Sequence, residues 1–383
     1  MESINAFLSC PFRFQTRKQV MRPGSAHEHM NINTFEYTGY PSNVFFGENS
    51  FNNVSKLLSP YKKVFVIAGN RLEPYVDNLK KNLGSERIAH FNKVEQHVPV
   101  ELIEVARQKQ IAENTDVLVA MGGGSAIGLA KALALKSKHP IVAVPTTYAG
   151  SEMTNIWGIT TPEGKTTGRD MIVLPRYVIY DPAFTERMPT SLAATSSMNA
   201  MAHLIEAIYA HDTNPITYIN SLDGIDKLKS GMSILAARGE LTMKANQLLQ
   251  YGSFMAGKVL CEVSMSLHHK MAHVLGGTFG LDHSSTHTVL LAYVLEYQWD
   301  VLSAEVKKDF CTALGHTYAP AALLELAKRM RAPTNLAAIG FKEEDIERAV
   351  DTVLAKPYAN PRELTKSGLM AMLAKAYRGQ LSE

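Results

Sequence analysis

Three histidines in one short stretch are the residues of this sequence most suited to chemistry: His269, His273 and His283. His269 and His273 are four residues apart, so on a helix they lie one turn apart on the same face. The glycine pair Gly276 and Gly277 separates them from His283. Because neutral imidazole is both a metal ligand and a base near neutral pH, the stretch indicates either metal binding or proton transfer.

A second polar set lies upstream, in the helical stretch SMNAMAHLIEA. Asn199 and His203 are four residues apart and share a helix face, and Glu206 follows one turn later. This face could complete a four-membered cluster with His269 and His283. Without the downstream histidines, an amphipathic helix with incidental polar residues would explain the pattern equally well.

The sequence MGGGSAIGLAK places glycines between a strand-like apolar run and a helical run. Glycines there let the backbone approach a ligand closely, and free N–H groups at the start of the helix bind a pyrophosphate. We therefore expect a dinucleotide phosphate site at Gly123, Gly124 and Ser125, although the spacing is not that of the usual Rossmann fingerprint or of a Walker loop. Another strand-like run, VFVIAGN, ends at Gly69 and Asn70, which we also expect beside the cofactor.

Hydroxyl groups follow the next apolar run, in the sequence PTTYAGSEMTN. A segment that follows a parallel strand lies at the carboxyl edge of the sheet, where ligands bind in open α/β folds. We expect Thr146, Thr147, Ser151 and Thr154 to hydrogen-bond a ribose or a carboxamide of the cofactor. An ordinary Ser/Thr-rich loop has the same composition.

Strand-like and helical runs alternate along the first part of the chain, as in a parallel sheet with helices on both faces. From Phe184 onward the pattern is helical almost throughout. We predict a dinucleotide-binding α/β domain at 30–183 and an all-α catalytic bundle at 184–383, preceded by a disordered leader at 1–29. The aromatic stretch 37–46 predicts strands around a turn.

Composition excludes several classes of protein. The 383 residues exceed what one hydrophobic core usually serves, and the 46% hydrophobic content can fill two. The net charge of +3 comes without a Lys/Arg cluster, so we expect no nucleic-acid partner. No apolar run is long enough to span a membrane. The three cysteines are too scattered for a disulfide framework, which fits a cytoplasmic protein.

The motifs GGGS, PTTYAGSE, NAxAHxxE and HxxxHxxGG, followed by His283, resemble the iron-containing alcohol dehydrogenase family. The resemblance runs from about residue 40 to 370 and implies the dehydroquinate synthase-like fold. In that family one aspartate and three histidines hold a divalent metal. His203, His269 and His283 match the histidines, but Asn199 stands at the aspartate position, and a neutral amide is a much weaker ligand for a hard cation.

Asn199, together with Gly128 where alcohol dehydrogenases often have an aspartate, is similar to the maleylacetate reductase branch of the family. The resemblance implies reduction of the carbon–carbon double bond of maleylacetate to 3-oxoadipate in aromatic compound degradation, with NADH or NADPH and no obligatory metal. It also implies a homodimer, formed through the stretch 37–46. Reduction of this double bond produces an enolate, which hydrogen-bond donors of the protein rather than a metal would stabilise. We expect His269 and His273 beside the nicotinamide.

In this reading His203 and His283 orient the oxygens of the substrate. The substrate is a dianion, so we also expect cationic and polar contacts from Tyr148, Lys165, Arg169 and Lys270, with Lys165 shared with the cofactor. No acidic residue follows Gly69–Asn70, and Arg71 could accept a 2′-phosphate, which predicts use of both NADH and NADPH.

Three alternatives stay open at this point. A metal-dependent alcohol or polyol dehydrogenase would result if the amide oxygen of Asn199 still bound zinc or iron. A lyase similar to dehydroquinate synthase would use the same fold without net oxidation. A nucleotide-binding protein without catalysis would keep the glycine loop and leave the histidines without a chemical role.

Overall fold

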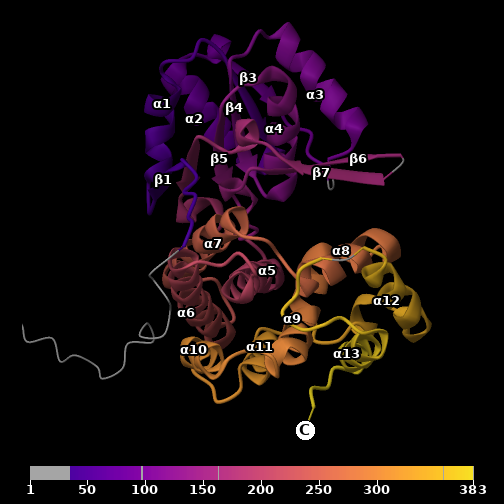
Figure 1. Cartoon of the computed structure of the whole chain (residues 1–383). Helices are drawn as coiled ribbons and strands as arrows, with labels where there is room; N and C mark the ends of the chain where they lie inside the picture. The colour runs from indigo at the N-terminus through magenta and orange to yellow at the C-terminus, as the bar shows by residue number, and fades with distance from the viewer. Residues whose placement is uncertain (1–34, 96–97, 163, 357, 383) are drawn as a thin grey trace, which may run out of the picture.

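A computed structural model describes residues 35–95, 98–162, 164–356 and 358–382, and the side chain of Lys165 is not among the described parts. The predicted leader at 1–29 lies outside the described residues. Figure 1 shows a sheet with its helices in the upper half of the view and a group of helices in the lower half.

The described residues form one six-stranded parallel sheet, as the alternating pattern predicted. In the order in which they lie, its strands are β1 (Asn43–Phe46), β8 (Tyr177–Tyr180), β5 (Ile141–Pro145), β4 (Val117–Gly122), β2 (Val64–Ala68) and β3 (Ile88–Phe91). The helices between them are α1 (Asn53–Leu58), α2 (Glu73–Leu83), α3 (Val100–Ala112) and α4 (Gly124–Ser137).

The central strand β2 shows why helices cover both faces. All five of its side chains are buried, and successive side chains point to opposite faces. Phe65 and Ile67 pack with residues of α3 and α4, whereas Val64 and Val66 pack with residues of α1 and α2. Both faces of the sheet are therefore closed, and its carboxyl edge is left to present the loops.

One hairpin was not predicted. Strands β6 (Ile156–Thr161) and β7 (Gly164–Arg169) pair antiparallel and project from the sheet beside α3 and α4 (Figure 1). Conversely, the expectation of strands on both sides of a turn in the stretch 37–46 is wrong, because β1 is the one strand there. The hydroxyl of Tyr37 donates to Glu262 at 2.8 Å, which draws this segment toward the helices instead.

The second half of the chain is helical, as predicted. Its helices are α5 (Thr190–Tyr209), α6 (Pro215–Arg238), α7 (Met243–Glu262), α8 (Leu267–Phe279), α9 (His283–Trp299), α10 (Ala304–Leu314), α11 (Ala319–Arg329), α12 (Ile346–Leu354) and α13 (Lys366–Arg378). Helix α5 is buried along nearly its whole length and packs against α6, α7 and α9. Polar residues on α5 therefore lie in the interior. Within the described residues, no helix has the length and apolar character needed to cross a membrane.

Candidate active site

Three helices bring the predicted cluster together. Helix α5 carries Asn199, His203 and Glu206, helix α8 carries His268, His269 and His273, and helix α9 carries His283 and His287. In Figure 1, α8 and α9 lie beside α5 on the side away from α6. The four predicted members thus come from segments far apart in the sequence and meet inside the helical half.

Glu206 fixes the start of α8. Its side chain is fully buried, and its oxygens accept from the backbone N–H groups of Ser266 at 3.1 Å and of His268 at 2.7 Å. A carboxylate at a helix N-terminus satisfies the unpaired donors and complements the helix dipole. Burial raises the pKa of Glu206, and the charge of His268 and these hydrogen bonds oppose the rise. The carboxylate of α5 therefore sets the position of α8.

The same carboxylate begins a line of hydrogen bonds. Glu206 Oε2 lies 2.6 Å from His269 Nδ1, and His269 Nε2 lies 2.6 Å from His203 Nδ1. With Glu206 ionised, His269 donates from Nδ1 and accepts at Nε2 from His203. If each ring changes which of its nitrogens carries the proton, a proton moves along the line while the rings stay in position and neutral. The arrangement suits proton transfer.

A second imidazole pair lies behind the first. His268 Nε2 is 2.9 Å from His287 Nδ1, both side chains are fully buried, and their other ring nitrogens have no hydrogen-bond partner among the described residues. The ring of His287 lies 4.4 Å, between centroids, from that of His283. Neither residue was predicted from the sequence. The available signal was the spacing of four between His283 and His287, which places them on one helix face.

Burial keeps these rings neutral. Desolvation lowers the pKa of His203, His269 and His287 well below the usual value, and it lowers the pKa of His268 to about 3. The charges of neighbouring histidines act in the same direction for His203, His269 and His287. At neutral pH the buried rings are therefore hydrogen-bond donors and acceptors rather than cations.

The exposed side of the cluster consists of His273 and His283. Their rings are nearly parallel, with centroids 6.2 Å apart, and the ring of His273 is also 6.2 Å from that of His269. Asn199 is buried, and its Oδ1 atom has no hydrogen-bond partner in the described part of the chain. The inner side of the cluster is thus buried and contains the amide oxygen of Asn199. The exposed side carries the imidazoles of His273 and His283.

This donor set does not fit the divalent metal that such a cluster would otherwise hold. Imidazole nitrogens bind zinc at about 2.0–2.1 Å with their lone pairs directed at the ion. His203 Nδ1 and His269 Nε2 instead face each other at 2.6 Å, the distance of a hydrogen bond between the two rings. Asn199 offers a neutral amide where a carboxylate would supply charge. No three His, Cys, Asp or Glu side chains of the described ranges are arranged to hold a metal ion.

A nucleotide cradle lies at the carboxyl edge of the sheet and fits a dinucleotide. Helix α4 begins at Gly124, and the preceding Gly123 has no side chain to cap the first N–H groups. A Cβ atom on Gly124 would meet no atom within 4 Å, whereas one on Gly123 would come within 3.0 Å of Thr147. The backbone donors of α4 are therefore accessible to a phosphate. Ser125 lies in the first turn of the same helix.

The neighbouring loops border this cradle. The N–H of Thr146 donates to the carbonyl of Gly122 at 3.1 Å, which joins the loop after β5 to the loop after β4. Gly69 ends β2 on the other side of β4, and a Cβ atom there would meet open space. The side chain of Asn70 accepts from Asn92 at 2.9 Å. Ser151 is partly buried at the far end of the β5 loop.

Three predicted contact residues have other partners. The phenol of Tyr148 is buried and donates to Asn246 at 2.9 Å, because the loop after β5 turns it into the helical half. The hydroxyl of Thr154 is buried and accepts from Lys131 at 2.9 Å. Arg169 donates to the carbonyl of Cys261 at 3.0 Å. All three side chains thus have partners within the chain, and their contacts with substrate or cofactor stay predictions.

Two predicted cations remain. Lys270 follows His269 on α8, and its ammonium lies 5.8 Å from the centre of the Tyr358 ring. The side chain of Lys165 lies outside the described parts. Lys270 is thus next to His269 in the chain, and its ammonium lies over the ring of Tyr358.

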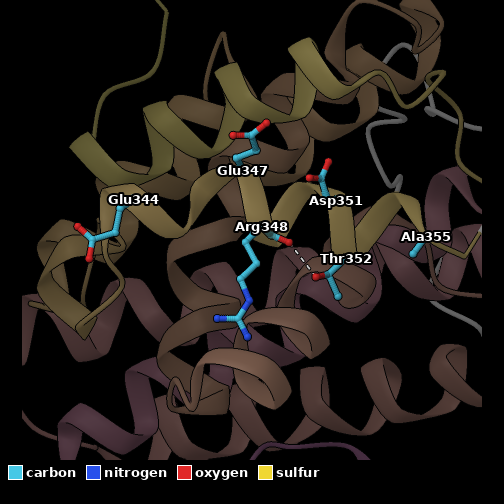
Figure 2. A pocket seen from close by; sticks show the side chains of 6 residues that line it. All are labelled: Glu344, Glu347, Arg348, Asp351, Thr352 and Ala355. Carbon is cyan, nitrogen blue, oxygen red and sulfur yellow. Dashed lines mark hydrogen bonds between the residues drawn. The ribbon is translucent and has the colours of Figure 1, made fainter.

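A surface hollow on α12 is a different feature. It is lined by Glu344, Glu347, Arg348, Asp351, Thr352 and Ala355 (Figure 2). Figure 2 shows Glu347 and Asp351 on one side of the helix and Arg348 and Thr352 on the other. Lys366 pairs with both carboxylates at 2.8 Å. The hollow contains none of the predicted site residues, and two of its three acids already pair with Lys366.

Comparison with known proteins agrees with this geometry. Residues 41–182 match the family described as iron-containing alcohol dehydrogenase, and residues 193–377 match the C-terminal part of the same family. The chain is 38% identical over 351 residues to a maleylacetate reductase of Burkholderia cepacia, covering 91% of this chain and 99% of the relative. It is 42% identical over 341 residues to a maleylacetate reductase of Delftia acidovorans, covering 88% and 96%.

The fold agrees as well. The crystal structure of maleylacetate reductase from Agrobacterium tumefaciens superposes with a TM-score of 0.86 at 33% identity, covering 91% of this chain and 99% of that one. The chain therefore belongs to the iron-containing alcohol dehydrogenase family and is an oxidoreductase, for which the family implies a nicotinamide cofactor.

Proposed function

We propose that this enzyme reduces the carbon–carbon double bond of maleylacetate to give 3-oxoadipate, with NADH or NADPH and without a metal. The observation that carries the proposal is the line Glu206–His269–His203, which lies beside Asn199 where a metal-binding carboxylate would stand. The similarity to relatives named maleylacetate reductase supports the same substrate.

The reaction requires hydrogen-bond donors rather than a Lewis acid. When bound, the reduced nicotinamide supplies a hydride to the alkene carbon remote from the ketone. The electron pair of the double bond then moves toward the ketone oxygen and forms an enolate. Hydrogen-bond donors can stabilise this charge in a dry site. A proton added to the carbon next to the ketone completes the reduction and balances the hydride.

The roles of the histidines follow from their places. His269 and His203 each use their single N–H within the buried line, so we assign them to passing a proton along it while Glu206 holds the tautomer of His269. His273 lies on the exposed side next to His269 and can take up a proton from solvent after each turnover. We assign His273 as the proton donor to carbon. His283, at the start of α9, orients the substrate.

The cradle at α4 binds the pyrophosphate, with backbone donors of Gly124 and Ser125. None of the three residues Gly69, Asn70 and Arg71 is acidic, and Arg71 is exposed. We therefore assign both NADH and NADPH as cofactors. An NADPH catalytic efficiency about a thousandfold below that of NADH would contradict this, because one lost charged contact explains much less.

The substrate is a dianion, so we expect a cation in its binding site. We assign Lys270, which follows His269 on α8, as the cation that attracts a carboxylate of the substrate.

Strand β1 is an edge strand that pairs with β8 on one side, so a second copy could join through the segment 37–46. We propose a homodimer. Light scattering after size-exclusion chromatography tests it, and a monomeric mass would contradict it.

An absorbance assay separates this function from its alternatives. The purified chain is mixed with NADH and maleylacetate, and separately with NAD⁺ and a series of simple alcohols and polyols. We expect NADH oxidation in the first mixture only, with 3-oxoadipate as product. Alcohol oxidation without maleylacetate reduction would indicate a metal-dependent dehydrogenase, and no redox change in either mixture would indicate a lyase or a nucleotide binder.

A further inference from the structure

Lys131 is a buried cation held by one short segment. It lies on α4, is 1% exposed, and donates from Nζ to the carbonyl oxygens of Ser151 at 2.7 Å and of Ile156 at 2.8 Å. Thr154 supplies two further acceptors, its carbonyl at 2.7 Å and its hydroxyl at 2.9 Å. Four oxygens from six consecutive residues therefore surround one nitrogen.

This cage matches an ammonium rather than an amine. A charged lysine has three N–H donors and no acceptor, whereas a neutral amine would point a lone pair at carbonyl oxygens. Burial lowers the pKa of Lys131 to about 7, with Arg169 acting in the same direction and Cys261 and Glu152 opposing it. The carboxylate of Glu152 accepts from Tyr180 at 2.7 Å. The oxygens of the segment are therefore the direct partners of the charge.

The segment that Lys131 holds lies between the two halves of the molecule. Gly150 has a φ of +80°, and a Cβ atom there would come within 2.9 Å of the backbone of Gly257 on α7. The N–H of Tyr148, two residues earlier, donates to the hydroxyl of Ser196 on α5 at 2.9 Å. The helix that carries Lys131 begins with the phosphate cradle at Gly124. One side chain thus connects the cradle helix to the loop that borders the histidine cluster.

We infer that Lys131 is a positioning residue for the nicotinamide cofactor: its charge holds the segment 151–156 in the shape that completes the cradle, without touching the cofactor. The inference rests on the proposed use of NADH or NADPH. It also explains why Thr154, expected to contact the cofactor, is turned inward. Ser151 binds Lys131 through its carbonyl oxygen and not through its hydroxyl.

The test compares Lys131→Met with Lys136→Met, a change at an exposed residue of the same helix. NADH binding is measured by fluorescence titration without substrate, so the result does not depend on which substrate is reduced. Loss of charge-assisted hydrogen bonds should weaken NADH binding in Lys131→Met by about tenfold or more. Lys136→Met should bind like the wild type. In steady state, KM for NADH should rise much more than kcat at saturating NADH falls.

A milder change covers the case in which Lys131→Met does not fold. Thr154→Val removes one acceptor of the cage and should weaken NADH binding by about threefold, the effect of one hydrogen bond. Binding as tight as in the wild type in whichever variant folds would overturn the inference, because a merely structural lysine changes heat stability and leaves the cofactor affinity as it was. A wild type that binds NADH but leaves maleylacetate unreduced would contradict the proposed substrate and not this role.

Discussion

His269 Nε2 and His203 Nδ1 lie 2.6 Å apart, at hydrogen-bond distance. The opposite nitrogen of His269 lies at the same distance from Glu206. While a hydrogen bond joins the two rings, one of the two facing nitrogens carries the proton, so their lone pairs do not both face a cation. This relationship favours a proton-transfer site over a metal site, although the helix positions resemble those of metal-binding relatives.

Replacing Glu206 by glutamine should disrupt the hydrogen-bonded line Glu206–His269–His203. A neutral amide no longer holds the Nδ1 proton of His269, so kcat should fall by about a hundredfold, within the range of positioned acid–base groups. The loss of charge at the start of α8 should also lower the free energy of unfolding by about 1 kcal/mol. Kinetics and urea unfolding check both effects, with Glu186→Gln at an exposed residue as control. An unchanged kcat would remove Glu206 from the mechanism.

His273→Asn should separate chemistry from stability. The side chain is exposed, so the free energy of unfolding should change by no more than about 0.5 kcal/mol. Loss of the proton donor should lower kcat by about a hundredfold while KM for NADH stays within about threefold of the wild type. The matched control is His316→Asn, distant in sequence and part of no ring contact with the cluster. If His273→Asn turns over as fast as the wild type, another group protonates the substrate.

Asn199→Asp should restore a metal-binding set. The new carboxylate would join His203 and His269 and supply the charge that favours a divalent cation. We expect the variant to bind zinc, detected by elemental analysis after dialysis, and to lose maleylacetate reduction. Asn199→Ala is the control, since it removes the amide without adding charge. A variant that stays metal-free at saturating zinc would show that the geometry of the rings, and not Asn199, excludes the ion.

Acid should remove the contribution of the buried neutral histidines to stability. The pKa of His268 is lowered from 6.5 to about 3, so the unfolded chain binds more protons than the folded chain between these values. Stability from this group is fully present above pH 6.5 and declines as pH falls toward 3. His287, whose pKa is also lowered, adds to the decline. Urea unfolding at pH 7 and pH 5 checks this, and equal midpoints would contradict it.

Much of the fold was predictable because it depends on local pattern. The continuous apolar runs of β2, which glycine follows, and of β4, which ends in glycine, are typical of buried parallel strands. The spacing of four in Asn199–His203 and in His269–His273 gave their shared faces without a structure. Hairpin β6–β7 was missed because the residues of β6 are only partly buried and its sequence lacks a regular apolar alternation.

What remained hidden depends on contacts between distant segments. Glu206 was visible only as a residue one turn after His203, and its role at the start of α8 arises from the packing of α5 against that helix. His287 and Lys131 looked like ordinary helix residues. Their burial and partners are set by the neighbouring helix α8 in one case and by the loop after β5 in the other.

The most direct test of the account is maleylacetate-dependent NADH oxidation by protein dialysed against a strong chelator, with residual metal measured in the same sample. The line Glu206–His269–His203 works without a cation, so the account predicts full activity at substoichiometric metal and no gain on adding zinc or iron. Activity that disappears on chelation and returns with one equivalent of metal would contradict it.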